Sequence, residues 1–139
     1  MDFLYQDPYP ILKDDTQYKK LTSDYVKVEQ LGDREILVVD PKGLELLAQE
    51  AMDDVSFMLR SAHLQKLRNI IEDPEATDND RFVAYNLLQN AAVAVEGQLP
   101  SCQDTGTAIV VAKKGENVYT GVDDGEWLSK GIYNTYQNK

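Results

Sequence analysis

The chain has 139 residues, enough for one domain with a core, and 42% of them are hydrophobic, which argues against disorder. Its formal net charge of −10 argues against a general binder of nucleic acid or of membrane surfaces, because both need clustered basic residues. A single cysteine excludes a disulfide within the chain, and the N-terminal residues lack the basic and apolar regions of a secretory signal, so we expect a cytoplasmic protein.

An irregular arm and a β-hairpin are predicted at the N-terminal end. Residues 1–22 are polar and interrupted by prolines, which is typical of an irregular segment. Residues 24–30 alternate apolar and polar side chains, and residues 34–39 are apolar and β-branched. The intervening Leu31-Gly32-Asp33 supplies turn chemistry, so the two runs predict a β-hairpin.

Three helices are predicted in the middle of the chain. The apolar residues within 44–59 recur at the helical period over about four turns. A shorter helix is expected over residues 64–71. A third begins after Thr77 or Asp78, either of which is a suitable cap, and Gly97 lies where a C-terminal cap belongs.

The last third of the chain predicts strands and a final helix. Residues 107–113 are typical of a buried strand, and residues 115–117 suit a hairpin turn into a short strand at 118–119. Asp123 or Asp124 is expected to cap the last helix.

The predicted fold class is α+β, because strands do not alternate regularly with helices. It consists of the arm and β-hairpin, a helical, bundle-like middle, short antiparallel strands after the only cysteine, and a C-terminal helix. Tyr133 and Tyr136 fall on the apolar face of that last helix, so we expect them in the core or in an interface.

The segment LPSCQDTGTA, residues 99–108, is here called the cysteine turn. It places Cys102 before polar Gln103, Asp104 and Thr105. A nucleophilic cysteine needs a base, and the only histidine is His63; a redox cysteine needs a second thiol; an iron–sulfur cluster needs several cysteines. Taken alone, the chain completes none of these sites, and an inert thiol in a capped turn is the alternative.

The cysteine turn, with VEGQ before it and IVVAKKG after it, resembles the first cysteine motif of class I fumarate hydratases, which depend on an iron–sulfur cluster. The resemblance extends over nearly the whole chain, through DPYPILKDDTQYKKLTSDYV near the start, SFMLRSAH at 56–63, DPEATDNDRFVA at 73–84 and KGIYNTY at 130–136. Related hydro-lyases such as tartrate dehydratase share the cysteine motif, but the N-terminal arm and hairpin favour a fumarase.

The resemblance implies a [4Fe–4S] cluster held by three cysteines, of which Cys102 is the first metal ligand. It implies that Gln103, Asp104 and Thr105 contact the substrate, that Asp104 is catalytic and orients a histidine from elsewhere in the enzyme, and that Gly106 adds a backbone donor. The iron without a protein ligand would act as a Lewis acid in the interconversion of fumarate and (S)-malate.

On this interpretation residues 1–139 are the N-terminal part of the catalytic domain of a longer enzyme that forms a homodimer. Alone they would hold no stable cluster and show no activity. The alternatives are a related iron–sulfur hydro-lyase, a stand-alone acidic binding module with an inert Cys102, or a thiol enzyme that uses Cys102 and His63. For Arg60 and His63 we favour structural roles at a helix junction, and the neighbouring Lys113 and Lys114 are expected to be solvated.

Overall fold

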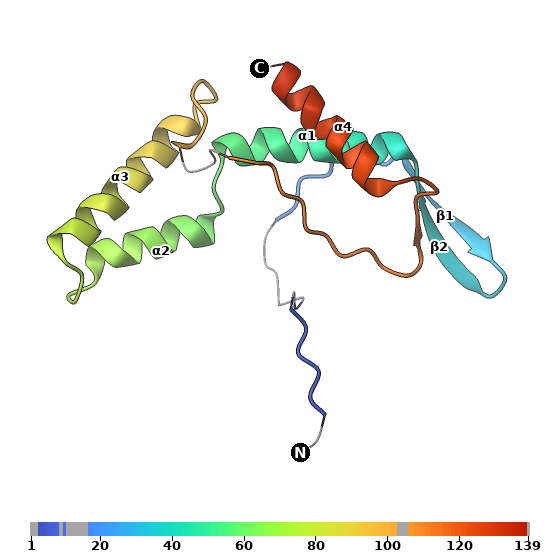
Figure 1. Cartoon of the computed structure of the whole chain (residues 1–139), viewed down its shortest axis with the longest axis horizontal. Helices are drawn as coiled ribbons and strands as arrows, with labels where there is room; N and C mark the ends of the chain where they lie inside the picture. Colours follow the sequence, from blue (N-terminus) through green and yellow to red (C-terminus); the bar gives the residue numbers. More distant parts are fainter. Residues whose placement is uncertain (1–2, 9, 11–16, 103–105, 139) are drawn as a thin grey trace.

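The computed structural model describes residues 3–8, 10, 17–102 and 106–138 and confirms the α+β class. Its elements, in chain order, are β1 (Val26–Leu31), β2 (Arg34–Val39), α1 (Pro41–Phe57), α2 (Ser61–Glu72), α3 (Asp78–Ala94), β3 (Val118–Tyr119) and α4 (Asp124–Gln137). Figure 1 shows α1 at the centre, with α4 and the sheet beside it and the α2–α3 pair extending from its C-terminal end. None of the described helices is long and apolar enough to cross a membrane.

The predicted β-hairpin is confirmed, and the sheet also contains a third strand. β1 and β2 pair antiparallel from Val26 opposite Val39 to Leu31 opposite Arg34. Gly32 occupies the connecting turn with a φ of 65°, a conformation that glycine adopts at little cost. β3 pairs with β2 in the parallel direction, with Val118 opposite Leu37.

The predicted short antiparallel strands after the cysteine turn are wrong in two respects. Residues 107–113 are not a strand, and the side chains of Ile109 and Val111 are 80% and 64% exposed. The pattern of residues 107–113 favours extended backbone, but a strand also requires a hydrogen-bonded neighbour, and none of the described strands pairs with this segment. Because β3 runs parallel to β2, residues 115–117 also do not join an antiparallel pair.

Helices α1 and α4 cross at very close range. A Cβ atom added to Gly131 would lie 2.2 Å from the carbonyl oxygen of Glu45 and 2.8 Å from the Cβ of Ala48. One turn along α4, the buried Thr135 hydroxyl donates a hydrogen bond of 2.9 Å to the carbonyl oxygen of Gln49. Small side chains at the crossing therefore let the two backbones approach each other.

The tyrosines of α4, expected in the core or in an interface, do not lie in the core of this chain. Tyr133 and Tyr136 are 61% and 57% exposed, whereas Gly131 and Thr135 are buried. A large ring would not fit at the crossing, so α4 places its small residues against α1 and its tyrosines on the outer surface.

Helices α2 and α3 form the second pair, whereas α1, the first helix of the predicted bundle-like middle, pairs with the C-terminal helix α4. α2 begins at Ser61, three residues earlier than predicted. The pair buries Leu67 of α2 and Ala84 of α3. Thr77 is confirmed as the cap of α3: its Oγ1 accepts from the Asp80 amide at 3.2 Å.

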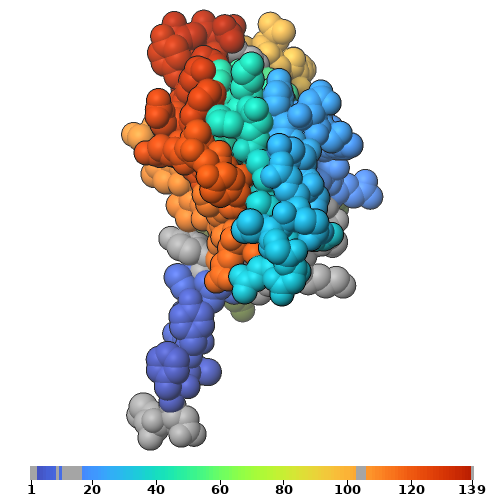
Figure 2. Space-filling model, turned by 90° about the vertical axis from the view of Figure 1, so that its right-hand side faces the viewer, coloured from blue at the N-terminus to red at the C-terminus, as the bar shows by residue number. Residues whose placement is uncertain are grey.

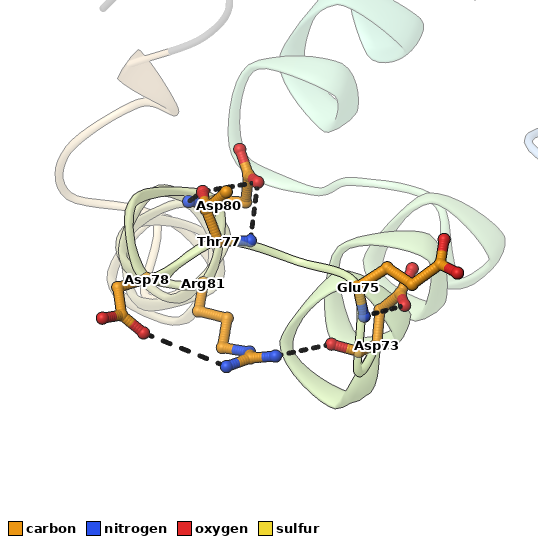
Figure 3. Close-up of polar contacts among 6 residues, drawn as sticks. All are labelled: Asp73, Glu75, Thr77, Asp78, Asp80 and Arg81. Atoms are coloured by element: carbon orange, nitrogen blue, oxygen red, sulfur yellow. Dashed lines mark hydrogen bonds and ion pairs between the residues drawn. The ribbon is translucent and has the colours of Figure 1, made fainter.

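The corner between α2 and α3 is stabilised mostly by local polar contacts, which Figure 3 shows. The Asp80 carboxylate accepts a hydrogen bond of 2.9 Å from the Thr77 backbone amide, completing a capping box. Arg81 donates to the carbonyl oxygen of Asp73 at 2.7 Å, which joins the end of α2 to the start of α3. The stretch 73–84, which resembles the family, is therefore a structural corner.

Candidate functional site

The cysteine turn begins at the junction of α1 and α3. Ser101 is only 4% exposed, and its backbone amide donates a hydrogen bond of 2.7 Å to the carbonyl oxygen of Ser56. Ser56 lies in the last turn of α1, where helix carbonyl groups lack a partner within the helix. The turn therefore supplies a hydrogen bond that α1 needs, and this contact fixes the start of the turn.

The side chain of Asn90, in α3, joins the turn to a second helix. Its Oδ1 accepts hydrogen bonds from the Cys102 backbone amide at 3.0 Å and from the Ser101 hydroxyl at 3.3 Å. Sequence reasoning missed this residue, although a signal was present. Asn90 lies one helical turn before Ala94, which is buried, and a polar group on a buried face requires a hydrogen-bond partner.

Cys102 itself is exposed at the surface of the turn. The residues expected beside it in the site, Gln103, Asp104 and Thr105, lie outside the described residues. Gly106 follows with a φ of 149°, in a region that favours glycine. The structure thus shows that hydrogen bonds to α1 and α3 position the backbone as far as Cys102.

Arg60 and His63 lie where α1 gives way to α2. Arg60 is the N-terminal cap residue of α2, and its carbonyl oxygen accepts from the His63 amide at 2.9 Å. Both side chains are exposed, and the Arg60 side chain makes no capping hydrogen bond. The junction is therefore formed by backbone contacts.

The two lysines after the cysteine turn were expected to be solvated; both are exposed, and each also has a carboxylate partner. The Nζ of Lys113 lies 2.5 Å from a carboxylate oxygen of Asp7 in the N-terminal arm, and the Nζ of Lys114 lies 2.5 Å from one of Asp124. The hydrogen bond from Lys114, together with one from the Thr120 hydroxyl, holds the pKa of Asp124 below its ordinary value. Both lysines thus already have carboxylate partners.

The described part of the chain contains no group of three His, Cys, Asp or Glu side chains that could hold a metal ion. Cys102 still fits the role of one ligand among several, because its thiol is exposed while its backbone amide is held by Asn90. The remaining thiolates of a multi-cysteine cluster would have to come from outside this chain, which has one cysteine.

Comparisons with known proteins point to one family. Residues 45–139 match the family model described as "Fumarate hydratase (Fumerase)". The chain is 55% identical over 134 residues to "Fumarate hydratase class I, anaerobic" of Escherichia coli (strain K12), covering 96% of this chain and 24% of that protein. It is 50% identical over 127 residues to "Fumarate hydratase 1, mitochondrial" of Leishmania major, covering 90% of this chain and 23% of that protein.

A third relative, "Fumarate hydratase class I, aerobic" of Salmonella typhimurium, is 53% identical over 134 residues, covering 96% of this chain and 23% of that protein. The chain thus spans about a quarter of the length of the curated relatives that it matches.

Proposed function

The chain belongs to the class I fumarate hydratase family, and from this we propose that it is the N-terminal part of a catalytic domain that interconverts fumarate and (S)-malate. The observation that carries the proposal is identity of 55% over 96% of the chain to a protein of that name. Because the chain spans only 24% of that relative, the activity belongs to the larger protein and the chain alone is expected to be inactive.

Within that enzyme, Cys102 is proposed as one of three cysteine ligands of a [4Fe–4S] cluster. When bound, such a cluster supplies a Lewis-acidic iron that favours departure of the malate hydroxyl or addition of water to fumarate. An exposed thiol with an anchored backbone amide supports this role, because a ligand must be accessible to its metal while its direction is restricted.

The residues that follow Cys102 are proposed to act on the substrate. Gln103, Asp104 and Thr105 would contact it, and Asp104 would also orient a histidine from the remaining part of the enzyme. A carboxylate beside an imidazole selects one tautomer and raises the basicity of the ring, as a proton-transfer step requires.

Charge neutralisation of the substrate must come from elsewhere in the enzyme. Fumarate and malate are dianions near neutral pH, whereas this chain carries a formal charge of −10. The two lysines nearest to the cysteine turn along the downstream chain, Lys113 and Lys114, are already paired with Asp7 and Asp124. We therefore place the cationic groups that bind the substrate carboxylates in the remaining part of the enzyme.

The proposal is tested on the whole protein that contains this chain, purified without oxygen, with Cys102→Ser and an exposed control, Ser129→Ala. We expect the parent protein and the control to contain iron and sulfide and to hydrate fumarate, and Cys102→Ser to lose both properties. Assays with tartrate separate fumarase from a related hydro-lyase. A parent protein without iron and without hydratase turnover would refute the proposal, as would full activity of Cys102→Ser.

A further inference from the structure

Three hydrogen bonds join Ser101 and Cys102 to the helices behind them, and two of these have the same acceptor. The Ser101 amide donates to the Ser56 carbonyl oxygen of α1. The Ser101 hydroxyl and the Cys102 amide both donate to Asn90 Oδ1 of α3. The Asn90 side-chain oxygen therefore ties the backbone of Cys102 to α3.

We propose that Asn90 is a positioning residue for Cys102, whose thiolate it directs toward the bound cluster. This inference rests on the proposed function of Cys102 as a cluster ligand and adds a residue that acts on that ligand through the backbone. Asn90 does not touch the cluster or the substrate in this proposal, so it is not a catalytic residue.

The local structure explains why the cysteine needs such a contact. After α3 ends at Ala94, the described residues enter no α-helix or strand until Val118, and Cys102 lies in a 3₁₀ turn, so no α-helix or sheet fixes the backbone there. A metal ligand has to be held within roughly 0.5 Å of its productive position, which an unsupported turn does not achieve. In place of the backbone hydrogen bonds of a helix or sheet, the Asn90 side chain gives the Cys102 amide a hydrogen-bond acceptor.

The platform that carries Asn90 is itself well packed. Ala84 and Ala94 of α3 are 2% and 1% exposed. Asn90 lies one turn before Ala94, so its side chain projects from a helix segment that is in contact with its surroundings. The oxygen that holds Cys102 is therefore anchored more firmly than the turn that it supports.

Two substitutions at position 90 separate the acceptor from the size of the side chain. Asn90→Leu removes the acceptor oxygen at similar volume, whereas Asn90→Asp retains an oxygen that can accept from the Cys102 amide. Asn86→Leu is the matched control, because Asn86 is exposed one turn earlier on α3 and its amide donates only within the helix, to the Phe82 carbonyl oxygen at 2.7 Å.

The first readout does not require the cluster. Hydrogen–deuterium exchange is followed by mass spectrometry on the whole protein without iron, in a peptide that includes Ser101 and Cys102. Asn90→Leu is expected to raise exchange of this peptide about tenfold, the factor that corresponds to one hydrogen bond of ordinary net strength. Asn90→Asp and Asn86→Leu are expected to exchange as the parent does.

The second readout is the rate at which the reconstituted protein loses iron to a chelator. We expect Asn90→Leu to lose it about tenfold faster than the parent, with Asn90→Asp and Asn86→Leu unchanged. If Asn90→Leu matches the parent in both readouts, the positioning role is refuted while the proposed function stands. If the parent binds no iron and sulfide, the proposed function fails and this inference fails with it.

A general folding defect is recognised by the aspartate variant. If Asn90→Leu exchanges faster everywhere, including α1 and α4, the comparison passes to Asn90→Asp. An aspartate variant that exchanges and loses iron as fast as a leucine variant shows that the acceptor oxygen is not what matters, and this result overturns the proposal.

Discussion

Helices α1 and α4 are joined by close backbone contact, whereas α2 and α3 are joined mainly at one end. The α1–α4 pair has Gly131 against the Glu45 backbone, and hydrogen bonds connect its two helices: Asn134 donates to the Glu45 carboxylate at 2.8 Å, and the Thr135 hydroxyl donates to the Gln49 carbonyl oxygen. Figure 2 shows α4 and the hairpin on either side of α1, forming a continuous face.

The α2–α3 pair has its strongest polar contacts at the corner around Thr77 and leaves apolar surface at its other end. A groove near the end of α1 is lined by the apolar residues Phe57, Met58, Leu59, Leu64, Leu88, Ala91, Ala92 and Val95. The cysteine turn is attached to this second pair through Asn90. The segment proposed to reach the cluster is therefore attached to the helix pair that leaves an apolar groove open within this chain.

This difference predicts that a change at the α1–α4 crossing has the largest effect on stability. Gly131→Ala places a Cβ atom 2.2 Å from the Glu45 carbonyl oxygen, so the helices must separate. We expect the free energy of unfolding to fall by about 3 kcal/mol, because overpacking here meets backbone and outweighs the helix preference for alanine. Urea unfolding followed by the fluorescence of Trp127, the only tryptophan and a residue of α4, measures the effect.

Gly115→Ala is the control for the substitution itself, because a Cβ atom there meets its nearest neighbour, the Val118 side chain, at 3.6 Å. Hydrogen exchange in α2 and α3 then sharpens the comparison. We expect α2 and α3 to keep the parent's protection from hydrogen exchange in Gly131→Ala. Equal loss of protection in both helix pairs would show that the pairs unfold as one unit. Wild-type stability of Gly131→Ala would show that the close crossing is wrong.

The sequence predicted the features that depend on local chemistry. The hairpin around Gly32, the cap at Thr77 and the helix that begins after Asp123 each follow from a few neighbouring residues, and the structure confirms them. The class of the fold follows from the order of such elements. The family was also recognisable, because several stretches spread along the chain resemble it together.

Features that depend on partners distant in the sequence were not predicted. The strand pattern at 107–113 gave no information about whether a neighbouring strand exists, and none pairs with it among the described residues. The aromatic residues of α4 dominated its apolar face, so Gly131 was not recognised as the point of contact. Asn90 was missed because its partner lies 12 residues further along the chain.

The second prediction tests the local capping of α2–α3. Thr77→Ala removes the oxygen that accepts from the Asp80 amide, and we expect about 1 kcal/mol of local stability to be lost at the start of α3. Thr77→Ser retains the hydroxyl and should behave as the parent. Hydrogen exchange measures the loss, which should be confined to α3 and the end of α2; destabilisation of α4 by the same amount would contradict the separation of the two pairs.

The smallest expected effect concerns acid, which acts on both pairs through different carboxylates. The side-chain hydrogen bond from Lys130 is the main reason that the pKa of Glu45 lies below its ordinary value of 4.5, with a further contribution from Asn134. Hydrogen bonds from the side chain and backbone of Thr77 likewise lower the pKa of Asp80. Each carboxylate therefore stabilises the fold above its ordinary pKa, and this contribution is lost as the pH falls through the lowered value.

Glu45→Gln separates the two contributions. It should cost about 0.5 kcal/mol near neutral pH, the usual size for a pair near the surface, because the attraction to Lys130 is lost. As the pH falls through the lowered pKa of Glu45, the variant and the parent should converge at the α1–α4 pair, as reported by Trp127, since the parent carboxylate is then protonated too. Exchange at the start of α3 should remain acid-sensitive in the variant, because Asp80 is unchanged. If Trp127 fluorescence changes with acid in the variant as it does in the parent, Glu45 is not the cause of that change. If hydrogen exchange at the start of α3 no longer responds to acid in the variant, acid acts on the two helix pairs through one shared group.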